Sequence, residues 1–365
     1  MLLIYSKINA VVILVRFFGM INRLLKQRFC LQQSRSPTYF NIAKQLQNNG
    51  IQYTRFNWLS SFNETNFQFN SSAAETLEFK HLLTQLVTQY CPDIIPETYC
   101  IHDQSWPLIL NQLTEKYYLK HNLLSDQVDD LVWVLKPSML NNGQHIKIFS
   151  HLSQLEQHFI SSKRLGGEHV LQRYITRPHL LKGHKYSIRM FVVITNYAGA
   201  YLYPHGYFNV AQHPYQPHDF SDLHPHLTNE HLDENESNVI QIPTQKFDFF
   251  PEVFQQIQNI VTNTISGLKQ LYPNAFYCEK QRALAIFGFD FCVDTDKRVW
   301  LLEANHGPCF PCSEAHPLQA FLYSNFWKAL VSSFVQPIMM RQSIETIQYQ
   351  LFIPIPIGNE DTGFE

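Results

Sequence analysis

Hydrophobic positions along the chain alternate between helix-like and strand-like spacing. Apolar residues recur near helical spacing at 250–272, and Ser36 followed by Pro37 predicts the start of a shorter helix. Apolar runs of strand length between turn residues predict β-strands. We expect helices at 36–48, 75–89, 106–118, 152–160, 250–272 and 317–334. We expect strands at 51–56, 96–101, 131–136, 146–149, 170–174, 186–195, 200–210, 283–293 and 298–304.

This mixed order of helices and strands predicts an α/β protein of the α+β kind, with a largely antiparallel central sheet. The first helix and strand indicate a small N-terminal α/β lobe. The strands at 131–136 and 146–149 are joined by a polar turn that contains Gly143, an arrangement that suits a mobile flap over a phosphate.

Composition favours a folded protein with a large core. The chain has 365 residues, of which 45% are hydrophobic and 14% aromatic, enough for two or three lobes that share a cleft. Its formal net charge is −2. The chain therefore has no global basic field for a polyanion, and no nucleic acid partner is expected.

Cysteines and histidines give only weak signals. The seven cysteines are scattered and odd in number, which fits a reducing compartment better than a disulfide framework. Cys309 and Cys312 have CxxC spacing without a second such pair, and five histidines between His205 and His226 lack a zinc spacing tied to a helix or strand. A redox or transition-metal role is therefore disfavoured.

The N-terminal region contains an apolar run from Ile8 to Val15, interrupted by Asn9 and flanked by basic residues. The run is too short to span a bilayer, and no convincing signal-peptide cleavage site follows it. It fits a core strand and helix, a non-native extension of the reading frame, or a basic amphipathic segment that touches a membrane or partner. We expect no stable membrane insertion and a cytoplasmic location.

The strongest chemical pattern lies on the two predicted strands near the C-terminal end. Asp290 is on the first strand, and Glu303 and Asn305 are two residues apart on the second, so the latter two point to one face. Oxygen donors from adjacent strands are the ligands that Mg²⁺ needs beside nucleotide phosphates. A buried hydrogen-bonding pair or an asparagine that supports a turn is the alternative.

Basic residues precede this pattern in the chain. Lys136 ends an apolar strand, from where it can reach a phosphate, although a surface lysine is the simpler interpretation of that position alone. Lys185 and Arg189 share a strand face with Ser187, and this face can line a phosphate channel or be solvated.

Eight short segments in this order resemble the tubulin–tyrosine ligase-like family, which has an ATP-grasp fold. The resemblance covers about residues 79–312. The segments are Pro96-Glu-Thr-Tyr99, Trp133-Val-Leu-Lys-Pro137, Val170-Leu-Gln-Arg-Tyr-Ile175, Lys185-Tyr-Ser-Ile-Arg189, Tyr201-Leu-Tyr-Pro-His-Gly-Tyr207, His226-Leu-Thr-Asn229, Phe287-Gly-Phe-Asp290 and Leu301-Leu-Glu-Ala-Asn305.

The resemblance implies an ATP- and Mg²⁺-dependent ligase that joins an amino acid to a protein carboxylate through an acyl phosphate, with tubulin as one candidate substrate. It implies an N-terminal lobe at 1–78, a central ATP-grasp lobe with the flap at 79–180, a C-terminal lobe with the magnesium site at 181–345, and a tail at 346–365. The central and C-terminal lobes would enclose the ATP cleft.

The resemblance also assigns roles to single residues. Arg189 and Lys185 would be catalytic, with Arg189 facing the phosphates or the incoming acyl group. The residues implied to bind ATP are Lys136 and Lys185 at the phosphates, Gln172 and Ile175 at the adenine, and Thr228 and Asn229 on the ribose–phosphate side. The implied magnesium ligands are Asp290, Glu303 and Asn305.

The chain departs from the family pattern at several positions. Pro204 and His205 stand where the family has arginine and glutamate, Ser187 replaces an aspartate, and the flap loses a cation and a glycine. An alternative function is therefore a catalytically degenerate member that binds ATP as a scaffold or regulator. Another ATP-grasp reaction, such as phosphorylation of a small molecule, is a further alternative.

Overall fold

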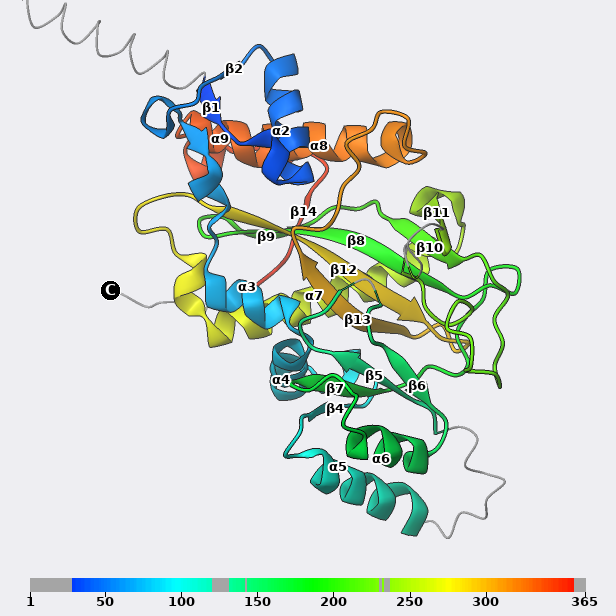
Figure 1. The fold of residues 1–365 in the computed structure, drawn as a ribbon. Helices are drawn as coiled ribbons and strands as arrows, with labels where there is room; N and C mark the ends of the chain where they lie inside the picture. The colour runs from blue at the N-terminus through cyan, green and yellow to red at the C-terminus, as the bar shows by residue number, and fades with distance from the viewer. Residues whose placement is uncertain (1–27, 120–130, 142, 230–231, 233–236, 358–365) are drawn as a thin grey trace, which may run out of the picture.

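The computed structural model describes residues 28–119, 131–141, 143–229, 232 and 237–357. The predicted basic N-terminal segment lies outside these residues. Figure 1 shows three layers: the N-terminal lobe with the C-terminal helices, a large sheet in the middle, and a smaller sheet with its own helices. No helix within the described ranges is long and apolar enough to cross a membrane.

The large sheet has seven strands, and all of its pairings are antiparallel, as expected. Its main path runs β11-β10-β8-β12-β13, while β9 joins β8 to β14. The strands are β8 (Tyr186–Thr195), β9 (Gly199–Leu202), β10 (Tyr207–Ala211), β11 (Val239–Pro243), β12 (Leu284–Val293), β13 (Val299–His306) and β14 (Ile353–Pro354). Strand β14 belongs to the segment that was predicted to be a tail.

The strand expected at 200–210 is split into β9 and β10, which pair with opposite halves of β8. The break lies at Tyr203–Gly206, where the chain passes close to β8. A Cβ atom at Gly206 would lie 2.0 Å from the Arg189 backbone oxygen, so only glycine fits this approach.

One face of the large sheet is covered by α7 (Phe250–Leu271), in a core that includes Ile188, Met190 and Phe289. The other face is divided. Its apolar half, with Phe191 and Ile286, packs against the C-terminal helices and the N-terminal lobe. These helices are the π-helical turn Gln319–Tyr323, α8 (Ser324–Leu330), a second π-helical stretch Val331–Val335, and α9 (Gln336–Met339), where one helix at 317–334 was expected.

The N-terminal lobe has a parallel sheet of β1 (Arg28–Cys30), β2 (Gln52–Tyr53) and β3 (Phe62–Asn63). Helix α2 (Pro37–Asn48) begins as expected, because the Ser36 side chain accepts a hydrogen bond from the Thr38 amide. The helix expected at 75–89 is instead α3 (Ser71–Glu78) and α4 (Lys80–Tyr90), separated by the extended residue Phe79.

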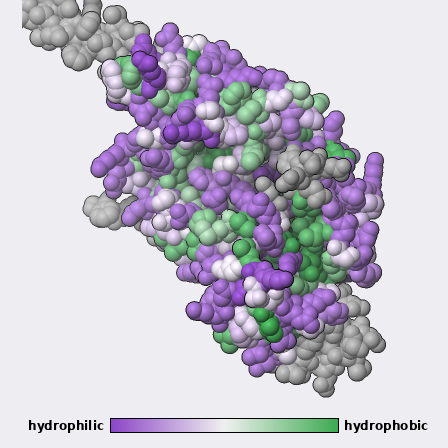
Figure 2. Space-filling model, viewed as in Figure 1, coloured by the Kyte–Doolittle hydropathy of each residue, from purple (hydrophilic) through white to green (hydrophobic). Residues whose placement is uncertain are grey.

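The smaller sheet has the antiparallel order β4-β7-β5-β6. Two helices pack on its outer face around Leu113 and Phe159. Its elements are β4 (Thr98–Ile101), α5 (Trp106–Leu113) with the π-helical continuation Thr114–Leu119, β5 (Trp133–Pro137), β6 (Lys147–Phe149), α6 (Leu152–Ile160) and β7 (His169–Arg173). Hydrophilic residues cover much of the face in Figure 2, with apolar residues gathered in smaller patches.

We predict that Gly206→Ala destabilises the protein by about 2–3 kcal/mol or more, because the new methyl group meets backbone that cannot move without breaking β8–β10 pairing. The matched control is Gly166→Ala, where the methyl group meets only the Asp103 side chain, at 3.1 Å. Chemical denaturation measures both free energies of unfolding. Equal, small effects would contradict the close approach.

Candidate functional site

A cavity of about 280 Å³ lies where the polar half of the large sheet faces the smaller sheet. Side chains of both sheets, the loop after β5 and the loop before β11 line it. The structure brings all the predicted site residues to this cavity: Lys136, Gln172, Ile175, Lys185, Arg189, Thr228, Asn229, Asp290, Glu303 and Asn305.

Strand register places the charged residues side by side on the cavity wall. Asp290 of β12 is opposite Glu303 of β13 and opposite Arg189 of β8. Residues opposite each other in antiparallel strands point to the same face. An irregularity follows Asp290, where the register of β13 shifts by one residue. Alternation along three strands therefore produces one row of ionisable groups.

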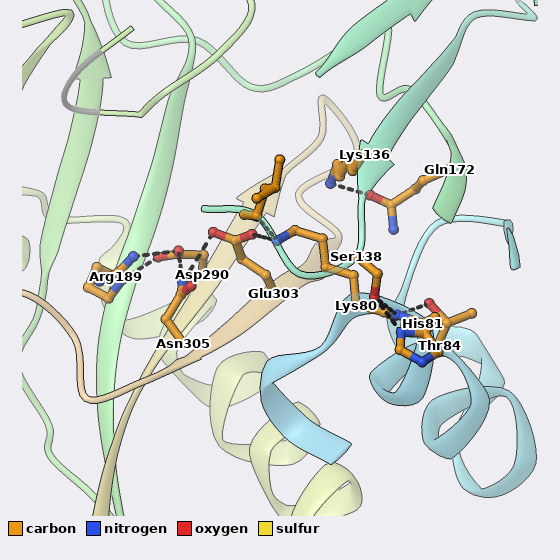
Figure 3. A network of polar contacts seen from close by, with 11 residues as sticks. Lys80, His81, Thr84, Lys136, Ser138, Gln172, Arg189, Asp290, Glu303 and Asn305 are labelled. Carbon is orange, nitrogen blue, oxygen red and sulfur yellow. Dashed lines mark hydrogen bonds and ion pairs between the residues drawn. The ribbon is translucent and has the colours of Figure 1, made fainter. Parts of the chain in front are cut away.

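These side chains form a continuous polar network (Figure 3). Arg189 donates to both Asp290 oxygens, from Nε at 2.5 Å and from Nη2 at 2.6 Å. The Asn305 amide donates to Asp290 Oδ2 and to Glu303 Oε1, each at 3.1 Å. Lys80 Nζ lies 3.3 Å from Glu303 Oε2. The network spans three strands of the large sheet and the start of α4.

Gly288 provides the space that the Arg189 side chain occupies. A Cβ atom at this position would lie 2.8 Å from Arg189 Cδ and 3.0 Å from Nη1. Gly288 is opposite Asn305 in the β12–β13 pair. Because the residue at 288 has no side chain, the Arg189 side chain can pass over it to reach Asp290.

Burial and neighbouring cations affect the two carboxylates differently. Burial raises the pKa of Asp290 to about 6, and the charge and hydrogen bonds of Arg189 offset only part of this rise. Burial also opposes ionisation of Glu303, but Lys80 and Lys136 outweigh it and lower the pKa of Glu303 to about 2. At pH 7 both groups are therefore carboxylates, the form that can bind a cation.

Lys80 is a site residue that sequence analysis missed. Its side chain is buried at the start of α4, and Nζ also donates to the Leu140 carbonyl of the loop after β5, at 2.9 Å. The signal was present, because Lys80 shares the apolar stripe of α4 with Leu83 and Val87 at helical spacing. A lysine on the apolar face of a helix requires a buried partner, and this partner is Glu303.

The two predicted phosphate-binding lysines also line the cavity. Lys136 Nζ donates to the Gln172 side chain at 2.8 Å, and Gln172 in turn donates to Thr98 at 3.0 Å. Lys185 Nζ donates to the Tyr174 hydroxyl at 2.8 Å. Burial lowers the pKa of each lysine to about 8. Each ammonium thus has a neutral hydrogen-bond partner rather than a directly bonded carboxylate.

The loop before β11 supplies the last predicted residues. Thr228 donates to Ser187 of β8 at 2.9 Å. Asn229 lies beside Gly143, because a Cβ at Gly143 would be 3.3 Å from Asn229 Oδ1. The glycine turn between β5 and β6 therefore packs against this loop at the cavity.

The donor set suits a hard cation. It has two carboxylates and one amide, and within the described ranges no group of three His, Cys, Asp or Glu side chains could hold a metal alone. Mg²⁺ commonly takes one or two carboxylates and completes its coordination with substrate phosphates and water. Binding through the Asn305 oxygen would require its amide to turn, which would also free Glu303 Oε1 and Asp290 Oδ2 from their hydrogen bonds to Nδ2.

All seven cysteines are free thiols. Cys309 and Cys312 are exposed free thiols, and Cys309 lies at the edge of the cavity.

The model of the tubulin-tyrosine ligase family matches residues 68–344. This range contains the smaller sheet, six of the seven strands of the large sheet and every predicted site residue. The chain belongs to the tubulin-tyrosine ligase family. The family resemblance of the sequence is thereby confirmed, and the mixed, largely antiparallel architecture agrees with its ATP-grasp-like fold.

Curated proteins that are similar to this chain have names that refer to several modifications of tubulin. The chain is 24% identical to "Tubulin glycylase 3D" of Tetrahymena thermophila, over 49% of this chain and 19% of that protein. It is 26% identical to "Probable tubulin polyglutamylase TTLL2" of Mus musculus, over 48% and 34%. It is 25% identical to "Probable tubulin--tyrosine ligase C12B10.04" of Schizosaccharomyces pombe, over 67% and 68%. The alignments thus cover a fifth to a third of the first two relatives.

We predict that Lys185→Met increases stability at pH 7, because it removes a buried charge. The pKa of Lys185 is about 8 in the folded protein against an ordinary value of 10.5, so the unfolded state binds more protons between these values. Wild-type stability should rise across pH 8–10.5, by up to about 3 kcal/mol from this group at about 1.4 kcal/mol per pKa unit.

Denaturant unfolding at pH 7, 8, 9 and 10 measures this contribution. Lys185→Met should show a smaller rise than wild type, whereas the exposed control Lys163→Met should follow wild type. Destabilisation by Lys185→Met at pH 7 with an unchanged pH slope would contradict a costly buried ammonium.

Proposed function

We propose that this protein is an ATP- and Mg²⁺-dependent carboxylate–amine ligase that adds an amino acid to a protein carboxylate. One observation carries the proposal: Asp290, Glu303 and Asn305 meet on one wall of a cavity that also holds Lys80, Lys136, Lys185 and Arg189. Metal-binding oxygens beside several buried cations are what a nucleoside triphosphate requires.

The residues of the cavity fit a reaction through an acyl phosphate. The substrate carboxylate would bond to the terminal phosphorus of ATP with release of ADP, and the amine would then displace phosphate to form the amide. Mg²⁺, held by Asp290, Glu303 and Asn305, would neutralise negative charge on the phosphates. Lys136 and Lys185 would bind the phosphates, and Arg189 would orient the acyl group or the terminal phosphate.

The remaining predicted residues would hold the nucleoside. Ile175 lines the cavity directly after β7, and backbone groups of this stretch suit an adenine edge. The Gln172 side chain is hydrogen-bonded to Lys136 and Thr98. We therefore propose that Gln172 lies on the adenine side of the site and holds the Lys136 ammonium in place. Thr228 and Asn229 would face the ribose.

The substrate is proposed from the relatives. Their names include tubulin glycylase, polyglutamylase and tubulin–tyrosine ligase. The proposed acceptor is therefore a protein with acidic side chains or a C-terminal carboxylate, with tubulin as the first candidate. An amino acid is the proposed amine donor. We propose a cytoplasmic location and no nucleic acid partner, in line with a formal net charge of −2.

A second candidate function is a nucleotide-binding scaffold that does not ligate. Two observations favour it. Arg189 is already paired with both oxygens of Asp290, through Nε and Nη2. Pro204 occupies the position where the family pattern has an arginine, so this cation is absent from the bend between β9 and β10.

We predict that the wild-type protein with ATP, Mg²⁺, tubulin and one member of a panel of amino acids releases ADP and incorporates that amino acid into tubulin. Glu303→Gln should reduce incorporation by at least about 100-fold, because it removes a metal-binding carboxylate. The matched control is Glu252→Gln, an exposed surface residue outside the cavity, which should keep wild-type activity. Radiolabelled amino acids measure transfer.

Binding separates the two candidate functions. Isothermal titration with ATP and Mg²⁺ should show that Lys136→Ala weakens affinity by about tenfold, the effect of one charge-assisted hydrogen bond. Tight ATP binding without transfer from any amino acid would favour the scaffold. Unchanged affinity in Lys136→Ala would remove this lysine from the proposed site.

A further inference from the structure

Behind Lys185, a chain of buried hydrogen bonds leads from the cavity into the histidine-rich loop before β11. Lys185 Nζ donates to the Tyr174 hydroxyl at 2.8 Å. The hydroxyl lies 2.9 Å from His226 Nδ1, and His226 Nε2 lies 2.7 Å from the Asp219 carbonyl oxygen. Lys185, Tyr174 and His226 are 8%, 6% and 1% exposed, so solvent cannot replace these partners.

The chemistry of the end group fixes the direction of every bond. A carbonyl oxygen only accepts, so His226 Nε2 carries the proton that bonds to Asp219. Burial lowers the pKa of His226, which favours the neutral ring, and Nδ1 then only accepts. Tyr174 must therefore donate its proton toward His226, and its lone pairs remain for the Lys185 ammonium.

A neighbouring tyrosine leaves this direction unchanged. The Tyr215 hydroxyl, which interacts with the Tyr174 hydroxyl, donates its own proton to the Thr176 carbonyl at 2.8 Å, so it offers no proton to Tyr174. Every group behind the Tyr174 hydroxyl is thus an acceptor. Toward the cavity, the hydroxyl offers only lone pairs, which attract the ammonium and would repel a phosphate oxygen.

This arrangement restrains a side chain that is otherwise flexible. Lys185 has a four-carbon stem with about 2 kcal/mol of rotamer entropy. Its Nζ lies over the Tyr174 ring, 4.0 Å from the centroid, in addition to the hydrogen bond. The tyrosine therefore holds the ammonium at two points and leaves its other N–H groups for the cavity.

The same histidine also anchors the loop that lines the cavity. The ring of Phe220 lies 4.9 Å from that of His226, and the Leu227 carbonyl accepts a hydrogen bond from Asn238 at 2.7 Å. Thr228 follows directly and donates to Ser187. His226 is therefore placed to hold Lys185 and the loop residues in one arrangement.

We propose that Tyr174 and His226 are positioning residues that aim Lys185 at an anionic phosphate of the nucleotide. The inference rests on the proposed function for the identity of the ligand, while the hydrogen-bond chain is a property of the protein itself. It gives the histidine-rich loop a specific task. In this loop His226 acts through its neutral, singly protonated ring and without a metal ion.

Two substitutions at one position separate positioning from simple packing. His226→Asn keeps an acceptor where Nδ1 was and loses the bond to Asp219. His226→Gln keeps a donor where Nε2 was and loses the acceptor for Tyr174. Both remove the ring and should lower the melting temperature. Only His226→Gln should weaken binding of ADP with Mg²⁺ by about tenfold, as for a lost charge-assisted contact.

A double-mutant cycle tests whether the effect passes through Lys185. Tyr174→Phe should weaken ADP binding about tenfold in the wild-type background and less than about twofold in Lys185→Met, because the lysine it positions is then missing. The control is Tyr203→Phe, which removes another buried tyrosine hydroxyl, one that has no hydrogen-bond partner among the described residues and lies outside the cavity. It should leave affinity unchanged.

Isothermal titration at 25 °C with ADP and Mg²⁺ gives the affinities, and melting temperatures show that each variant is folded. Additive effects of Tyr174→Phe and Lys185→Met, or equal losses in His226→Asn and His226→Gln, would overturn the positioning role and leave the proposed function standing. Absence of nucleotide binding by the wild-type protein would overturn both.

Discussion

The mutual compensation of buried charges on one wall of the cavity is the constraint on which the site depends. A carboxylate taken out of water is costly unless it is paired and hydrogen-bonded. Arg189 and Lys80 supply the pairing for Asp290 and Glu303, and Asn305 bonds to both carboxylates. These partners come from β8, the start of α4 and β13, so the folded arrangement of three distant segments is needed to keep the two carboxylates ionised.

The alternation of side chains along the strands determines where in the fold these charged residues lie. On β8, Ile188 and Met190 enter the core beneath α7, while Arg189 and Phe191 point to the opposite face. That face changes from polar to apolar within one strand, and β12 makes the same change between Asp290 and Ile286. The polar half is left for the smaller sheet to enclose. The large sheet thus contributes apolar side chains to the core and polar side chains to the cavity wall.

Local sequence patterns were sufficient to predict most strands of the large sheet and the positions of the oxygen donors. The two-residue spacing of Glu303 and Asn305 and the adjacency of β12 and β13 place three donors on one face, and the structure brings these side chains together. Their role as metal ligands stays a prediction. The break between β9 and β10 was missed because its cause, the close approach of Gly206 to Arg189, is a contact across the sheet. Spacing along one strand cannot reveal it.

Cations that come from other elements were harder to predict for the same reason. Lys80 has a local signal on the apolar stripe of α4, but its partner is more than two hundred residues away in the sequence. Lys136 and Lys185 have neutral partners, and burial lowers their pKa values to about 8. Among the described residues neither ammonium is bonded directly to an anion, and such groups raise the free energy of the folded protein. A polyanion that enters the cavity relieves this cost, so the same burial that weakens the fold favours phosphate binding.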